Sequence, residues 1–255
     1  MAPTDLGSVT MTGISESIAR LRTAQKSSRG APAYSRFVNR PLGRPLAAIA
    51  AELGLSPSHV TLLSAACTFS AIAAVALVPP TATGSLVIAA LLVLGYALDS
   101  ADGQLARLTG SASLAGEWLD HCIDAAKAVS IHLAVLVSWA RFLDAPPAML
   151  LVPLGFAAVA STFFFALIAV DLLRRIHRLQ HPDAPVVERT GGTSPLYALL
   201  VVPADYGLLC LLFAALWLPA LFVPAYTAIA AINALLLVVG LVRWHRSLRV
   251  LSRAA

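Results

Sequence analysis

Six stretches of mostly apolar residues follow one another along the chain, and they restrict its fold more than any other feature. Each has about 20 residues or more, the length of a helix that crosses the hydrocarbon core of a bilayer. A helix also satisfies its own backbone hydrogen bonds there. The stretches are residues 60–78, 86–108, 114–142, 149–173, 197–222 and 225–242. We therefore expect an all-α polytopic membrane protein with six transmembrane helices.

The composition agrees with this expectation. The 255 residues are 58% hydrophobic and 12% charged, whereas a soluble domain is about a quarter charged. The net charge of +5 does not indicate nucleic-acid binding, because the basic residues are spread out and form no recognisable nucleic-acid module. Cys67, Cys122 and Cys210 each lie in an apolar stretch, which indicates small hydrophobic residues rather than disulfides or a zinc site.

The chain divides into three parts. Residues 1–32 are polar and rich in Ser, Thr and Gly, so we expect a flexible tail. Residues 33–54 have the pattern of a juxtamembrane amphipathic helix, and residues 55–255 form the six-helix membrane domain.

The amphipathic segment carries a basic face. Arg36, Arg40 and Arg44 recur every four residues and so share one side of a helix. We expect this helix to lie on the membrane surface and to be interrupted near Pro41 and Pro45. An ordinary packed surface helix is the alternative.

The positions of Lys and Arg predict the orientation. With the N-terminus in the cytoplasm, only Arg141 of the 18 Lys and Arg residues falls in an outer loop. Positive residues gather on the cytoplasmic side of membrane proteins. Both termini are therefore expected to be cytoplasmic.

Four carboxylates lie in the second and third stretches, where each costs roughly 2.5 to 3.5 kcal/mol at a span centre. Asp99 and Asp102 are three residues apart, and Asp120 and Asp124 are four apart, so each pair shares a helix face. The short turn 110–113 makes the two helices antiparallel neighbours whose acidic faces oppose each other. One or two divalent cations relieve the repulsion, and oxygen ligands suit Mg²⁺ or Mn²⁺.

Small residues and one cation accompany the carboxylates. Gly103, Ala106 and Gly116 leave a gap between the helices for a phosphate-bearing ligand, and Arg107 can hold a phosphate oxygen. Carboxylates, a metal, an Arg and a gap indicate phosphoryl transfer. Asp124 is the candidate general base, because it lies deepest along the third helix and away from the other carboxylates.

Two other interpretations fit single features of this segment. The carboxylates could pair with Arg107 and Lys127 as structural ion pairs, but two cations do not match four acids on facing helices. Intramembrane carboxylates also mark cation pathways. A cation transporter is less favoured, because the four acids gather at one end of the bundle.

Eight residues of the acidic segment resemble the signature of the CDP-alcohol phosphotransferase family at every fixed position. In chain order they are Asp99, Asp102, Gly103, Ala106, Arg107, Gly116, Asp120 and Asp124, separated by two, none, two, none, eight, three and three residues. The resemblance implies a two-metal site on the four aspartates, with Asp124 as base. It further implies CDP binding by Asp99, Asp102, Gly103, Ala106, Arg107 and Gly116, and a homodimer.

Two nearby segments also bear on the resemblance. Family members commonly carry Pro-Asn-x-Val-Thr at the start of the first span, whereas this chain has Ser58 at the Asn position. Residues 39–42, Asn-Arg-Pro-Leu, look like members that act on inositol phosphates or other polar headgroups.

The resemblance implies an enzyme that displaces CMP from a CDP-linked donor, with CDP-diacylglycerol as the leading candidate, by an alcohol acceptor, forming a phospholipid. The same chemistry with a CDP-polyol or CDP-aminoalcohol donor, or with an inositol-phosphate acceptor, is the alternative. The residues that could bind the acceptor are Lys127, Arg174, Arg175, Arg189 and Asp205. Each of these residues also has a structural explanation. Lys127 could form an ion pair with the acids, and Asp205 could cap a helix. The arginines could mark the cytoplasmic side of the membrane and contact anionic lipids.

Overall fold

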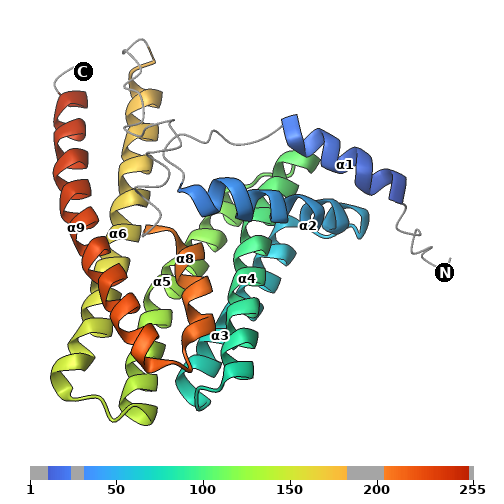
Figure 1. Cartoon of the computed structure of the whole chain (residues 1–255). Coiled ribbons are helices and arrows are strands. Elements are labelled where there is room, and N and C mark those ends of the chain that lie inside the picture. The colour runs from blue at the N-terminus through green and yellow to red at the C-terminus, as the bar shows by residue number, and fades with distance from the viewer. Residues whose placement is uncertain (1–10, 24–31, 183–203, 253–255) are drawn as a thin grey trace.

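The computed structural model describes residues 11–23, 32–182 and 204–252, and every regular element in these ranges is a helix. Five of the helices are long and apolar enough to span a bilayer. They are α3 (Pro57–Leu77), α4 (Ala82–Thr109), α5 (Leu114–Phe142), α6 (Pro147–Gln180) and α9 (Pro219–Leu251). Figure 1 shows them as one bundle. The prediction of an all-α polytopic membrane protein is confirmed.

The predicted fifth span, residues 197–222, is described only from residue 204 onward. Its described part contains α8 (Tyr206–Leu212) and the short 3₁₀ helix η3 (Phe213–Ala215), which are too short to cross a bilayer together. The last span begins at Pro219 rather than at residue 225, because proline suits the first turn of a helix.

Local capping explains how α3, α4 and α5 are delimited. Ser56 and His59 form a capping box at the start of α3. Gly110 ends α4 with φ 66°, a left-handed conformation that glycine adopts easily. The Ser113 side chain accepts a hydrogen bond from the Gly116 N–H and begins α5. The turn 110–113 joins α4 and α5 as an antiparallel pair (Figure 1), but the two helices make little direct contact with each other, because α3 packs against both.

The amphipathic segment crosses the end of the bundle at which the α4–α5 turn lies (Figure 1). It consists of the π-helix η1 (Ser35–Asn39) and α2 (Arg40–Glu52). The predicted interruption at Pro41 and Pro45 is wrong, because the chain stays helical through both. Pro41 lies in the first turn of α2, where no N–H is needed, and the irregular turn is the π-helix that precedes it.

The segment expected to be a polar tail contains a helix, α1 (Met11–Thr23). Leu21 is fully buried and packs in a small core with Ala47 of α2, Val60 of α3 and Leu105 of α4. The apolar residues of α1 recur at helical spacing among polar ones, although the segment as a whole is polar.

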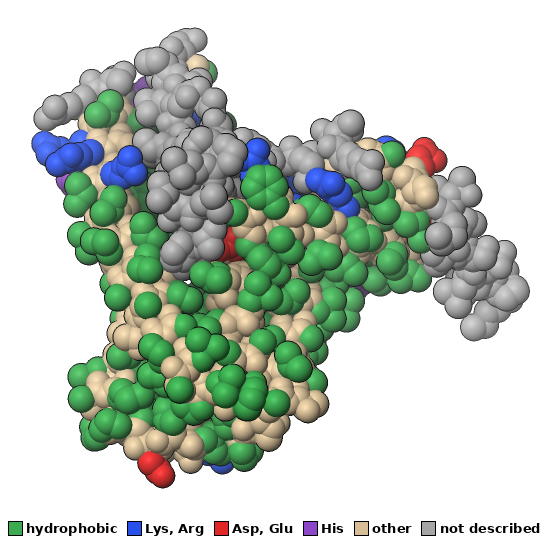
Figure 2. All heavy atoms as spheres, in the orientation of Figure 1, with side chains coloured by type: hydrophobic (Ala, Val, Ile, Leu, Met, Phe, Trp, Pro, Cys, Tyr) green, Lys and Arg blue, Asp and Glu red, His purple; other side chains and the backbone are tan. Residues whose placement is uncertain are grey.

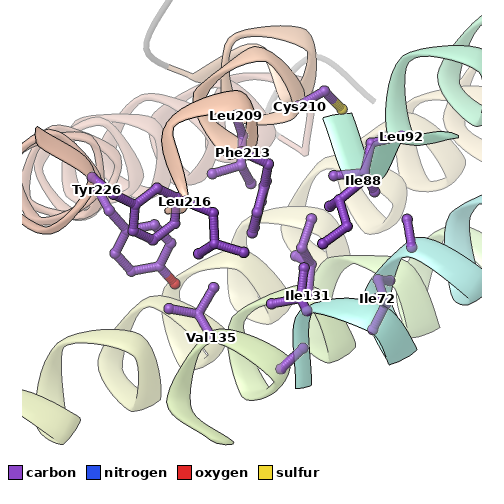
Figure 3. Close-up of a cluster of buried hydrophobic side chains, with 14 of the residues drawn as sticks. Ile72, Ile88, Leu92, Ile131, Val135, Leu209, Cys210, Phe213, Leu216 and Tyr226 are labelled. Atoms are coloured by element: carbon purple, nitrogen blue, oxygen red, sulfur yellow. The ribbon is translucent and has the colours of Figure 1, made fainter. Parts of the chain in front are cut away.

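The main hydrophobic core joins α3, α4, α5, α6, α8, η3 and α9, and Figure 3 shows part of it. Ile72, Ile88 and Ile131 meet Leu209 and Phe213 there. α3 and α4 approach each other closely beside this core. A Cβ added to Gly95 would lie only 2.2 Å from the Thr68 hydroxyl oxygen, so glycine permits this approach. Apolar side chains cover most of the visible outer surface, while Lys and Arg gather at the α2 end of the bundle (Figure 2).

Candidate active site

Three of the four motif aspartates come together between α4 and α5. Each of Asp99, Asp120 and Asp124 offers a carboxylate oxygen, and these three atoms lie within 4.8 Å of one another. Hard carboxylate oxygens at this separation can hold a divalent cation such as Mg²⁺ or Mn²⁺. The three residues are only partly buried, so an ion can reach them.

Asp102 is held apart from this cluster by α3. Its side chain is buried and accepts a hydrogen bond of 2.6 Å from the Thr61 hydroxyl and another from the Gly103 N–H. The Thr61 hydroxyl also contacts the Pro57 carbonyl at 3.0 Å. Thr61 was not predicted as a site residue, although it is the last residue of the Val-Thr pair that resembles the family at the start of the first span.

Lys127 forms an internal counter-ion for the acids. Its Nζ lies 2.6 Å from Asp99 Oδ1, 3.2 Å from Asp124 Oδ1 and 3.2 Å from Ser64 Oγ. Only 5% of Lys127 is exposed. The ion-pair interpretation of Lys127 therefore holds in this structure. The position of Asp124 along its helix predicted that it lies away from the other carboxylates. This prediction is wrong, because α4 places Asp99 next to Asp124.

A cavity of about 840 Å³, here called the outer cavity, lies between α3 and the α4–α5 hairpin. Residues predicted to bind CDP line it together with two of the aspartates. They are Asp102, Gly103, Ala106, Arg107, Gly116 and Asp120, whereas Asp99, which was also predicted to bind CDP, does not line this cavity. Ser58, which stands at the family's usual Asn position, lines it as well. The cavity is large enough for a nucleotide, and the small residues keep its floor open.

A second cavity of about 260 Å³, here called the inner cavity, lies among α3, α4, α5, α6, α8 and α9. Asp99, Asp124 and Lys127 form its polar end. Most of the remaining lining is apolar, with Phe156 and Phe163 as examples, and Asp205 and Asn233 also line the cavity. The four aspartates thus form a wall between two cavities: Asp102 and Asp120 line the outer one, and Asp99 and Asp124 line the inner one.

The predicted basic acceptor residues are not gathered around this wall. The Arg175 guanidinium donates two hydrogen bonds to Glu117, at 2.9 Å and 3.2 Å, and Arg174 Nη2 donates to Ser247 of α9 at 2.8 Å. Arg189 lies outside the described residues. Glu117 therefore anchors α6 to α5 beside the outer cavity.

Asp205 caps α8 and joins it to the amphipathic segment. Its carboxylate accepts hydrogen bonds from the Gly207 N–H at 2.9 Å, the Ser35 N–H at 2.8 Å and the Tyr96 hydroxyl at 3.3 Å. Tyr34 stacks on Tyr96, and burial raises the pKa of the Tyr34 hydroxyl above its ordinary value, so the ring stays neutral. The helix-cap interpretation of Asp205 holds, although Asp205 also lines the inner cavity.

The chain was compared with protein families and with curated proteins. The family model described as CDP-alcohol phosphatidyltransferase matches residues 55–243, a range that includes α3 to α8 and most of α9. No curated protein matches the chain. All eight residues of the acidic signature lie inside the matched range.

Proposed function

Because the chain belongs to the CDP-alcohol phosphatidyltransferase family, a family of phosphotransferases, we propose that it transfers the substituted phosphate of a CDP-linked donor to an alcohol and releases CMP. The observation that carries the proposal is the carboxylate cluster of Asp99, Asp120 and Asp124, whose oxygens lie within 4.8 Å of one another at the edge of the outer cavity. This arrangement suits a pyrophosphate between a nucleotide and a metal site.

The residues present fit a divalent cation, and we propose two, Mg²⁺ or Mn²⁺. The acids that would hold them are Asp99, Asp102, Asp120 and Asp124. When bound, the cations neutralise charge on the phosphate oxygens during transfer. Asp102 is kept in place for this role by Thr61 at 2.6 Å. Lys127 shares Asp99 and Asp124 with the ions.

The nucleotide occupies the outer cavity. Gly103, Ala106 and Gly116 offer no bulky side chain, so the backbone of the hairpin can approach the pyrophosphate. Arg107 extends from the same face of α4 and binds a phosphate oxygen.

Asp124 acts as the general base. Its carboxylate takes the proton of the acceptor hydroxyl, and the hydroxyl oxygen forms a bond to the β-phosphorus. The bond between that phosphorus and the oxygen of CMP breaks, and CMP leaves with the electron pair. Asp124 suits this role because it lines the inner cavity, across the wall from the nucleotide.

CDP-diacylglycerol is the first donor to test, because the site lies among membrane-spanning helices and the product is then a phospholipid. A CDP-polyol or CDP-aminoalcohol is the second candidate, favoured by the apolar lining of the inner cavity. The homodimer implied by the family resemblance stays a prediction.

The site is proposed to face the cytoplasm, with both chain termini on that side. The gathering of Lys and Arg at the α2 end of the bundle supports this orientation (Figure 2). Arg141, at the far end of α5, is an exception.

The test is CMP release by the purified protein in detergent, with each donor class, Mg²⁺ or Mn²⁺ and a panel of alcohols. We expect release that stops completely on chelation by EDTA and returns when the cation is restored. Nucleotide binding is measured separately by calorimetry with CDP. A protein that binds no CDP in the presence of either metal contradicts the proposed function.

A further inference from the structure

The shape of the inner cavity limits what can reach Asp124 from its side of the wall. Asp124, Ala128 and His132 are each four residues apart on α5, and all three line the cavity. Eight residues of helix correspond to about 12 Å. The cavity therefore extends from the acid pair well into the apolar interior of the bundle, in the direction of the bilayer centre.

The lining beyond the acids is apolar. It includes Ile131, Phe156, Phe163, Phe164, Leu167 and Ile229. Among the described lining residues, Lys127 is the one Lys or Arg, and it already contacts Asp99 and Asp124. A phosphorylated, water-soluble acceptor needs cationic partners beyond Lys127, and the described lining residues supply none. An apolar molecule is instead stabilised by leaving water.

Polar groups interrupt the apolar lining at Thr68, Tyr96, His132, Asp205, Tyr206 and Asn233. The Thr68 hydroxyl is buried and has no hydrogen-bond partner in the described part of the chain. It lies beside Gly95, one helical turn below Asp99 on α4, or about 6 Å deeper. Farther in, His132 is paired with the Tyr226 hydroxyl at 2.7 Å. A buried hydroxyl donor just below the acid pair fits an oxygen-bearing group, such as an ester, next to the reacting alcohol.

Transfer geometry assigns the cavity to the acceptor. The attacking and leaving oxygens lie roughly in line on opposite sides of the phosphorus. With CMP in the outer cavity, the attacking oxygen comes from the inner one. This step rests on the proposed function.

We infer that the acceptor is a lipid alcohol of the diacylglycerol type, with its hydroxyl at Asp124 and the adjoining segment of its apolar part in the inner cavity, whose volume of about 260 Å³ leaves the rest of the chains in the bilayer. It enters from the bilayer rather than from water. The basic side chains first considered for a phosphorylated acceptor, Arg174 and Arg175, instead hold α6 against α9 and α5.

The first experiment compares acceptors in detergent micelles. Dioleoylglycerol is supplied with CDP-choline, CDP-ethanolamine, CDP-glycerol or CDP-diacylglycerol, and CDP-diacylglycerol is also supplied with glycerol 3-phosphate, inositol phosphate or serine. We expect CMP release only where dioleoylglycerol is present. Release with a water-soluble acceptor alone overturns the inference and leaves the proposed function standing. Silence with every pair overturns both.

A variant then tests the cavity itself. Ala160 of α6 lines the inner cavity, whereas Ala158 on the same helix is exposed. Ala160→Phe is expected to raise the KM for dioleoylglycerol about tenfold, since it fills part of the cavity. Ala158→Phe is the matched control and should leave the KM unchanged. Unaltered CDP binding shows that both variants fold.

The outcome also separates the two lipids that could occupy the cavity. If Ala160→Phe raises the KM for CDP-diacylglycerol and not that for the acceptor, the cavity holds the chains of the donor and the inference is wrong. An unchanged KM for dioleoylglycerol in Ala160→Phe contradicts it equally.

Discussion

The outer and inner cavities share one wall of aspartates but are built in different ways. All residues that line the outer cavity lie between Ala51 and Asp120, on α2, α3 and one helical hairpin. Those of the inner cavity are spread from Thr68 to Asn233 and come from six helices. A site made by one hairpin is fixed by local spacing, whereas a site made by the whole bundle depends on how distant helices pack. The two cavities should therefore respond differently to substitution.

The largest expected effect is at the wall itself. Asp124→Asn keeps the shape of the side chain and removes the base, so kcat for CMP release should fall about 10³-fold. CDP binding should change little, because Asp124 does not line the outer cavity. Single-turnover CMP release and calorimetry with CDP measure the two quantities. Loss of CMP release together with loss of CDP binding would mean that Asp124 also contributes to the nucleotide site.

The next effect concerns the counter-ion. Lys127→Met leaves Asp99 and Asp124 without their cation, which should lower the free energy of unfolding by about 3 kcal/mol in metal-free buffer. Mg²⁺ should then raise the thermal midpoint more in the variant than in the unsubstituted protein, because ion and lysine use the same carboxylates.

The control is Arg141→Met, which removes an exposed cation at the other end of α5. It should change the free energy of unfolding by less than about 0.5 kcal/mol and leave the response to Mg²⁺ as it was. An equal response to Mg²⁺ in both variants would show that Lys127 and the ion occupy independent places.

The smallest expected effect is that of a substitution in α8. This helix lines the inner cavity and not the outer one, so the substitution should affect the two cavities differently. A Cβ on Gly207 would lie 1.9 Å from the Tyr34 ring. Gly207→Ala should therefore cost about 2 kcal/mol of stability and weaken acceptor use more than CDP binding. Gly155→Ala on α6, whose Cβ meets nothing within 4 Å, should be neutral or slightly stabilising. Chemical unfolding and KM values measure both effects.

The sequence predicts the outer cavity better than the inner one, for a physical reason. Asp99, Asp102, Asp120 and Asp124 lie on two helices joined by a four-residue turn, so helical periodicity alone brings their faces together. The six apolar stretches likewise predicted the membrane class, because length and hydropathy decide it.

Features that depend on distant packing could not be predicted in the same way. Nothing in the spacing of Arg175 and Glu117 shows that they pair across α6 and α5. Lys127 was assigned two roles from sequence, and only the position of Asp99 on a neighbouring helix distinguishes them. The helix α1 was missed, because a single buried leucine, Leu21, anchors it in an otherwise polar segment.

The apolar lining beside Asp124 has a consequence for the fate of the donor. Water is a smaller nucleophile than any alcohol and is present at far higher concentration, so an open site would break the donor down by hydrolysis. Phe156, Phe163 and their neighbours give water few partners on the side from which attack occurs. If the acceptor is a lipid, as inferred above, the same side chains would favour transfer to that lipid over hydrolysis of the donor.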